Sequence, residues 1–218
     1  MLGYVPCMAN GDSDGPRKPR RGYHHGNLRE ALVSAARRLI AEKGAAGFAF
    51  SDAAKAAGVS PAAPYRHFKD RDDLLAEVAR QGFEDLADRL EAAFEAGGPS
   101  PMRAFDAVTA AYLAFAREER PAYLAMFQPG VSTTPDVARA SERAFAVLRR
   151  ACEGLVRHLP PAERPPLHMM AYHLWALAHG TTELFGTENS RRAPIPAEDL
   201  LEAAALIYLR GLGLVPDS

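Results

Sequence analysis

The stretch SPAAPYRHF contains residue types that suit contact with a nucleic acid. Tyr65 and His67 can donate hydrogen bonds to phosphate oxygens, and Arg66 can pair with a phosphate or with the edge of a base. Ala62 and Ala63 are small, which permits close approach to bases and contact with thymine methyl groups. This combination of small and hydrogen-bonding side chains predicts a surface that binds double-stranded DNA.

Lys69 and Arg71 follow this stretch and flank the expected start of the next helix. The free backbone amides and the positive dipole end of a helix N-terminus favour an anion. We therefore predict a second group of phosphate contacts at this helix start.

Two short helices joined by a tight turn are expected to position these side chains. An alanine-rich stretch at 51–57 predicts the first helix, and Gly58 permits the positive φ that such a turn requires. Ser60 followed by Pro61 indicates the start of the second helix, because a hydroxyl can cap free amides and proline loses nothing at the first position. A compact helix pair with a glycine-containing turn is the helix-turn-helix pattern.

The remainder of the chain also has helical periodicity, with apolar residues three to four positions apart. Asn27 and Asp70 are expected to cap two of these helices. The expected helices cover residues 27–43, 70–96, 102–118, 121–127, 135–158, 168–185 and 200–214. No strand-like alternation stands out. The sequence predicts an all-α protein of about nine helices, with an N-terminal three-helix helix-turn-helix domain and a C-terminal helical bundle.

The composition is typical of a globular protein, since 48% of the 218 residues are hydrophobic and 24% are charged. No apolar run is long enough to cross a bilayer and no signal peptide is visible, so we expect no membrane partner. With only Cys7 and Cys152, a disulfide framework is excluded. A reducing cytoplasm is the simplest compartment.

Charge is distributed unevenly along the chain, although the formal net charge is only −1. Residues 17–80 contain 13 Lys and Arg against 7 Asp and Glu, whereas residues 81–218 contain 13 against 18. A basic first third joined to an acidic remainder suits a module that binds a polyanion.

The chain is expected to divide into three parts. Residues 1–22 predict a disordered basic tail, which either solubilises the protein or lies along DNA phosphates as an arm. Residues 23–70 predict the DNA-binding domain, and residues 71–218 predict a helical domain that binds an effector and dimerises.

The order of these features resembles the tetracycline-repressor (TetR) family of transcriptional regulators. The resemblance covers residues 21–80 and depends on GYHHGNLREALVSAARRLIAEKGAAGF and AAKAAGVSPAAPYRHFKDRDDLL. It implies a homodimer that holds two reading heads over a palindrome, about one helical turn or roughly 34–36 Å apart. The residues that it places at or near DNA are Ser60, Pro61, Ala62, Ala63, Tyr65 and His67, with Arg71 at a position of phosphate contact.

Two positions depart from the family pattern. Where a Ser or Thr cap and a following Arg are usual, this chain has Ala49 and Ser51. Ser51 is expected to substitute weakly, so one phosphate contact is lost and binding weakens without a change in sequence preference. Pro64 removes a backbone donor within the expected recognition helix, although the first turn tolerates that loss.

The C-terminal part contains WALAHG, which resembles the motif of a subfamily named for Trp-His-Gly. That resemblance implies a small effector bound inside the helical bundle, which moves the DNA-binding heads apart. Aromatic residues with a few polar tips suit an apolar or aromatic effector. The residues that periodicity places around it are Phe105, Thr109, Tyr112, Tyr123, Phe127, Trp175 and His179.

Two other hypotheses remain. One is a helical DNA-binding regulator without a small effector, which a filled C-terminal core would favour. The other is a metal-dependent enzyme that uses His179 and Glu183, which are one helical turn apart, with His173 nearby. Against an enzyme, the sequence has no glycine-rich phosphate loop, nucleophile elbow, HExxH or paired-cysteine metal motif. We expect no catalytic residue, no metal and no cofactor, and a ligand-responsive regulator that is a repressor.

Overall fold

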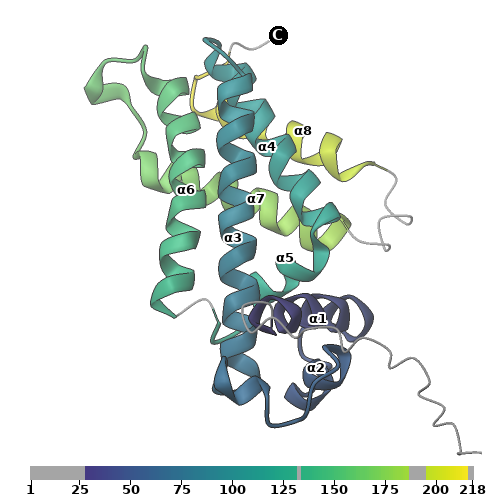
Figure 1. Ribbon diagram of the computed structural model, residues 1–218. Helices are drawn as coiled ribbons and strands as arrows, with labels where there is room; N and C mark the ends of the chain where they lie inside the picture. The colour runs from purple at the N-terminus through teal and green to yellow at the C-terminus, as the bar shows by residue number, and fades with distance from the viewer. Residues whose placement is uncertain (1–27, 132–133, 187–194, 216–218) are drawn as a thin grey trace, which may run out of the picture.

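The computed structural model describes residues 28–131, 134–186 and 195–215, which form eight α-helices, two 3₁₀ helices and no strand (Figure 1). The all-α prediction is confirmed. The expected cap Asn27, the tail at 1–22 and Cys7 lie outside the described residues. The α-helices are α1 (Leu28–Lys43), α2 (Phe50–Ala56), α3 (Arg71–Ala96), α4 (Pro101–Glu118), α5 (Arg120–Met126), α6 (Pro135–Val156), α7 (Leu167–Phe185) and α8 (Ala197–Gly211).

The long helix α3 is the axis of the molecule. It packs against α4, α5 and α6 along most of its length and against α1 near its start (Figure 1). Asp70 caps it as predicted, because its Oδ1 accepts a hydrogen bond of 2.9 Å from the amide of Asp73. Leu74, Val78 and Leu86 are fully buried on this helix, so α3 contributes to the core from its first turns onward.

A buried carboxylate joins α3 to α1. The side chain of Glu77 is 6% exposed and accepts hydrogen bonds from Arg29 of α1 at 2.6 Å and from Arg80 at 2.7 Å. Arg80 donates a second bond through Nε at 2.9 Å, and Gln81 donates another of 2.9 Å. Burial opposes ionisation of Glu77, but these hydrogen bonds outweigh it and lower its pKa from 4.5 to about 2. The carboxylate therefore stays charged and holds α1 at a fixed angle to α3.

Helix α3 also lies unusually close to α5. A Cβ added to Gly82 would lie 2.9 Å from Met126 Sδ and 3.2 Å from the Ala122 Cβ, so the glycine is what allows the two helices to approach. Helices α3 and α5 are therefore in close contact at Gly82.

The second helix of the helix-turn-helix pair was predicted to start at Ser60 and Pro61, but the structure has no α-helix there. Residues 61–63 form a turn, and only Pro64–Arg66 form a short 3₁₀ helix, η1. Proline explains this, since Pro64 has no amide to donate and each neighbouring amide reaches a carbonyl three residues back: Ala63 to Ser60 at 3.0 Å and His67 to Pro64 at 2.9 Å.

The turn before this segment is as predicted. Gly58 has a φ of +72°, a conformation that residues with a Cβ rarely adopt. Helix α2 begins without a capping hydroxyl, as Ala49 indicated, but Asp52 compensates: its Oδ2 accepts from the Ala49 amide at 3.1 Å.

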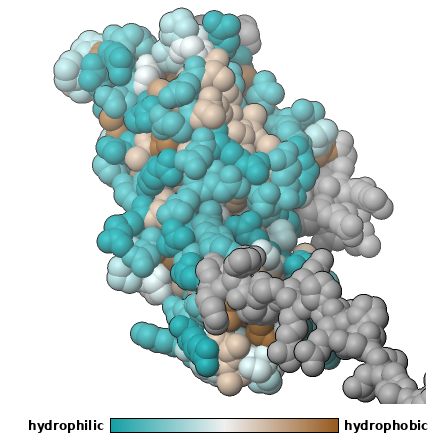
Figure 2. All heavy atoms as spheres, viewed as in Figure 1, coloured by the Kyte–Doolittle hydropathy of each residue, from teal (hydrophilic) through white to brown (hydrophobic). Residues whose placement is uncertain are grey.

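Helices α7 and α8 pack against each other and leave large apolar side chains exposed. On α7 the exposed fractions are 55% for Met169, 59% for Tyr172 and 69% for Leu184, and on α8 Ile207 is 70% exposed. The face seen in Figure 2 is by contrast mainly hydrophilic. No helix in the described ranges is long and apolar enough to cross a membrane.

Replacing Glu77 with Gln is expected to lower the free energy of unfolding by about 3 kcal/mol at pH 7, because Arg29 and Arg80 lose their buried, charged partner. Folding lowers the pKa of Glu77, so the ionised carboxylate stabilises the folded protein at pH values above its pKa in the unfolded chain. This stabilisation is lost as the pH falls from 4.5 towards 2. Denaturant titrations at several pH values should therefore show the two proteins converging near pH 2.

A matched control is Glu84→Gln, which removes a carboxylate that is 44% exposed and also bound to Arg80. We expect it to cost no more than about 1 kcal/mol. Equal losses for the two variants at pH 7 would contradict the role given to Glu77.

Candidate functional site

The residues predicted to face DNA form an exposed surface at the end of the molecule that holds α1 and α2. Ala63 and His67 are half-buried, while Pro64 is buried and so is not part of the surface. The exposed residues are Ser51, Ser60, Pro61, Ala62, Tyr65, Arg66 and Lys69. We call them, with Ala63 and His67, the recognition surface.

Tyr65 is the largest side chain of the recognition surface and is 64% exposed. Its ring meets the ring of Phe50 edge-on, with centroids 5.1 Å apart. Because Phe50 is the first residue of α2, this contact joins α2 to η1 and orients the tyrosine, most of which stays exposed.

Arg71 was predicted to contact a phosphate, but its guanidinium is directed towards the loop between α1 and α2. Its Nε donates to the carbonyl oxygen of Phe48 at 2.9 Å, and its Nη2 donates to the carbonyl oxygen of Ala45. The guanidinium also lies over the Phe48 ring, 5.1 Å from the centroid. Arg71 therefore ties the loop between α1 and α2 to the start of α3.

The start of α3 is also filled by its own side chains. The Lys69 amide donates to Asp73 Oδ2 at 2.9 Å, and the Asp73 amide donates to Asp70 Oδ1. Two amides near this helix start, those of Lys69 and Asp73, therefore already have carboxylate partners within the chain. Lys69 still presents an exposed ammonium beside it.

Five of the seven predicted effector residues meet in one aromatic cluster: Tyr112, Tyr123, Phe127, Trp175 and His179. The Tyr123 hydroxyl lies 2.7 Å from His179 Nδ1 and 3.4 Å from the Tyr112 hydroxyl. Burial raises the pKa of Tyr123 to about 12 and lowers that of His179. All three groups are neutral at pH 7, and their polar atoms satisfy one another.

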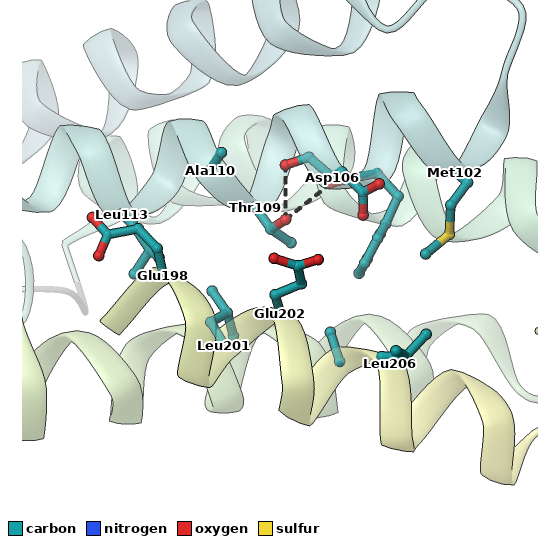
Figure 3. A pocket seen from close by; sticks show the side chains of 11 residues that line it. Met102, Asp106, Thr109, Ala110, Leu113, Glu198, Leu201, Glu202 and Leu206 are labelled. Carbon is teal, nitrogen blue, oxygen red and sulfur yellow. Dashed lines mark hydrogen bonds between the residues drawn. The ribbon is translucent and has the colours of Figure 1, made fainter. Parts of the chain in front are cut away.

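Little space remains beside this aromatic cluster. A cavity lined by Thr109, Tyr112 and Trp175 has a volume of about 20 Å³, close to that of a single water. A much larger pocket of about 290 Å³ lies between α4 and α8, where the remaining predicted residues Phe105 and Thr109 contribute to its wall (Figure 3).

The three residues considered for a metal have separate partners. His173 Nδ1 lies 3.0 Å from the Tyr208 hydroxyl, and Glu183 accepts from Arg120 at 3.2 Å. His179 bonds to Tyr123 instead. Within the residues that the structure describes, no three His, Cys, Asp or Glu side chains gather as metal ligands.

Two family models match this chain, one in its N-terminal part and one in its C-terminal part. Residues 32–78 match the model of bacterial regulatory proteins of the tetR family, and residues 105–206 match that of the tetracyclin repressor-like C-terminal domain. The two matches together span more than half of the chain. The chain belongs to the tetR family of bacterial regulatory proteins.

Individual relatives are more distant. The HTH-type transcriptional regulator BetI of Rhizobium meliloti is 34% identical over 101 residues, which are 45% of this chain and 50% of that protein. The chain thus aligns with only half the length of this curated relative.

Two solved structures have a similar fold. A protein of unknown function from Rhodococcus sp. RHA1 has a TM-score of 0.72 at 29% identity over 88% of this chain and 98% of its own. The TetR family regulator PfmR of Thermus thermophilus has a TM-score of 0.64 at 22% identity over 82% of this chain and 97% of its own.

The position of Arg71 predicts that its loss destabilises the fold. Arg71→Ala should lower the free energy of unfolding by about 2 kcal/mol, because two carbonyl oxygens lose a charged donor. Lys69→Ala, which removes an exposed neighbouring charge, should stay within about 0.5 kcal/mol of the original protein. Denaturant unfolding compares the two, and an unchanged stability for Arg71→Ala would refute the assignment.

Proposed function

We propose that the protein is a DNA-binding transcriptional regulator, and specifically a repressor that binds a palindromic operator. The observation that carries this is the exposed recognition surface, in which a buried proline and the Phe50 contact hold Tyr65 in place. Arg66 and Lys69 supply exposed positive charge for phosphates, while Ala62 leaves room for base edges.

We further propose that the protein acts as a homodimer. A palindrome requires two recognition surfaces related by two-fold symmetry. The exposed apolar residues of α7 and α8, including Met169, Tyr172, Leu184 and Ile207, offer a self-complementary face for this pairing. The matched C-terminal domain of the family supports the same interpretation.

We infer that a small molecule bound in the C-terminal bundle releases the protein from DNA. The pocket between α4 and α8 supports this, since its volume of about 290 Å³ lies near the lower end of the usual range for small-molecule sites. Membership of the Trp-His-Gly subfamily, carried by Trp175, His179 and Gly180, is part of this proposal. A cytoplasmic location and the absence of enzymatic activity are also part of this proposal.

Selection of bound duplexes from a random DNA library is the direct test of DNA recognition. We expect a palindromic consensus with half-sites one helical turn apart. Tyr65→Ala should weaken binding to every selected duplex by a similar factor of about tenfold, because a phosphate contact carries no sequence information. Replacing Ala62 with Ser should instead change the consensus.

Glu153→Gln serves as a control for this experiment, because Glu153 is exposed on α6, away from the recognition surface. Its affinity for the selected duplex should match that of the original protein. If Tyr65→Ala bound as tightly as the control, the proposed docking surface would be refuted.

The dimer face can be tested with a charge at its most exposed apolar position. Ile207→Glu should shift the protein from a dimer to a monomer in sedimentation equilibrium, because two carboxylates would face each other across the two-fold axis. Ala162→Glu places the same charge on an exposed residue outside α7 and α8 and should remain dimeric. A dimer that persists in Ile207→Glu would place the interface elsewhere.

A further inference from the structure

The pocket between α4 and α8 differs in character from the aromatic cluster that the sequence predicted as the effector site. Its walls are largely aliphatic, and α4 and α8 both contribute (Figure 3). The apolar lining residues are Met102, Phe105, Ala110, Leu113, Leu201, Ala205 and Leu206. A ligand here would need an apolar body.

The polar side chains of this pocket are mostly carboxylates. Asp106 extends from α4 and Glu202 from α8, and Figure 3 shows the Glu202 carboxylate directed across the pocket towards α4. Glu198, one turn before Glu202, is balanced by Arg117 at 2.5 Å. Among the described residues, Asp106 and Glu202 have no cationic partner.

Asp106 and Glu202 are both exposed residues of the pocket wall, and both carry negative charge. Partial burial and the neighbouring charge of Glu202 raise the pKa of Asp106. A positive group between them would remove the repulsion and would gain two charged acceptors.

The hydrogen-bonding capacity of the pocket points in the same direction. Thr109 uses its hydroxyl proton within α4, where Oγ1 lies 2.9 Å from the Asp106 carbonyl oxygen and 3.2 Å from that of Phe105 (Figure 3). Its hydroxyl oxygen can then only accept a further bond. With Asp106 and Glu202 also acceptors, the pocket favours a ligand that donates, as a protonated amine does.

We propose that this pocket binds a small organic cation, with its protonated amine between Asp106 and Glu202 and its apolar body against Phe105 and Leu201. A carboxylate ligand would face two like charges, and a neutral ligand would leave both negative charges without a counter-charge. As the identity of the effector, this inference rests on the proposed regulatory function; as a binding site, it can be tested separately.

The position of the pocket on α8 keeps it clear of the proposed dimer face. Glu198, Leu201, Glu202 and Ala205 follow a helical spacing and face α4. Ile207 lies five residues after Glu202, which places it about 140° further around the helix. The pocket can therefore remain open when two chains pair through Ile207.

Three probes of similar size and different charge test the proposal. 4-Phenylbutylamine is cationic at pH 7, 4-phenylbutanol is neutral, and 4-phenylbutyrate is anionic. Isothermal titration calorimetry on the full chain should give the tightest binding for the amine, by about tenfold over the alcohol, and the weakest for the carboxylate. Equal affinities for the three probes, or no binding of the amine, would overturn the proposal.

Variants locate the site. The double variant Asp106→Asn, Glu202→Gln should lose about tenfold in amine affinity and keep its alcohol affinity, and its thermal unfolding should be no lower because a repulsion is removed. Glu198→Gln should lose less, since Arg117 already balances its charge. Tyr123→Phe alters the aromatic cluster and should leave amine binding unchanged. A loss of amine binding in Tyr123→Phe alone would place the ligand in the aromatic cluster.

A DNA-binding measurement separates this inference from the proposed function. The double variant should bind the selected duplex as the original protein does, and about tenfold more amine should be needed to release it than to release the original protein. Amine binding without any duplex binding would refute the regulatory function and keep the cation site. Duplex binding without amine binding would refute the cation site alone.

Discussion

The buried carboxylate of Glu77 is the interaction on which the position of the recognition surface depends. It lies on α3, the helix shared by both halves of the protein, and it accepts from Arg29 on α1. An ionised group that is only 6% exposed is tolerated because two guanidinium groups and Gln81 satisfy it. Its bonds have narrow geometric requirements, so α1 and the elements packed on it move with α3 rather than independently of it.

A second set of ion pairs joins the N-terminal helices to the C-terminal bundle at the start of α5. Glu119 accepts from Arg37 of α1 at 3.3 Å and from Arg89 of α3 at 3.4 Å. Arg120 then reaches Glu183 of α7 at 3.2 Å. Three helices, α1, α3 and α7, thus contact two adjacent residues at the junction of α4 and α5. Since α4 also carries Asp106 in the pocket, a displacement of α4 would act directly on the contacts that hold α1.

The helices were predictable from sequence because apolar periodicity and caps are local signals. Asp70 and the start of α3 are one example, and Gly58 with its positive φ is another. The 3₁₀ form of η1 was not predicted. Its hydrogen bonds reach back three residues instead of four, because Pro64 lacks the amide that would continue an α-helix. Sequence placed Arg71 beside a helix start, but nothing local indicated that the carbonyls of Ala45 and Phe48 lie within its reach.

The candidate effector site also depends on contacts between distant parts of the chain, which local sequence patterns do not reveal. Spacing correctly grouped Tyr112, Tyr123 and His179, yet these groups satisfy one another and leave a cavity of only about 20 Å³. A ligand could enter there only by breaking neutral hydrogen bonds and separating packed rings. The pocket with Asp106 and Glu202 requires no such rearrangement, but it arises from the pairing of α4 with α8, elements far apart in the sequence. In this protein the proposed ligand position therefore depends on two carboxylates brought together by α4 and α8, whereas the aromatic residues already pair with one another.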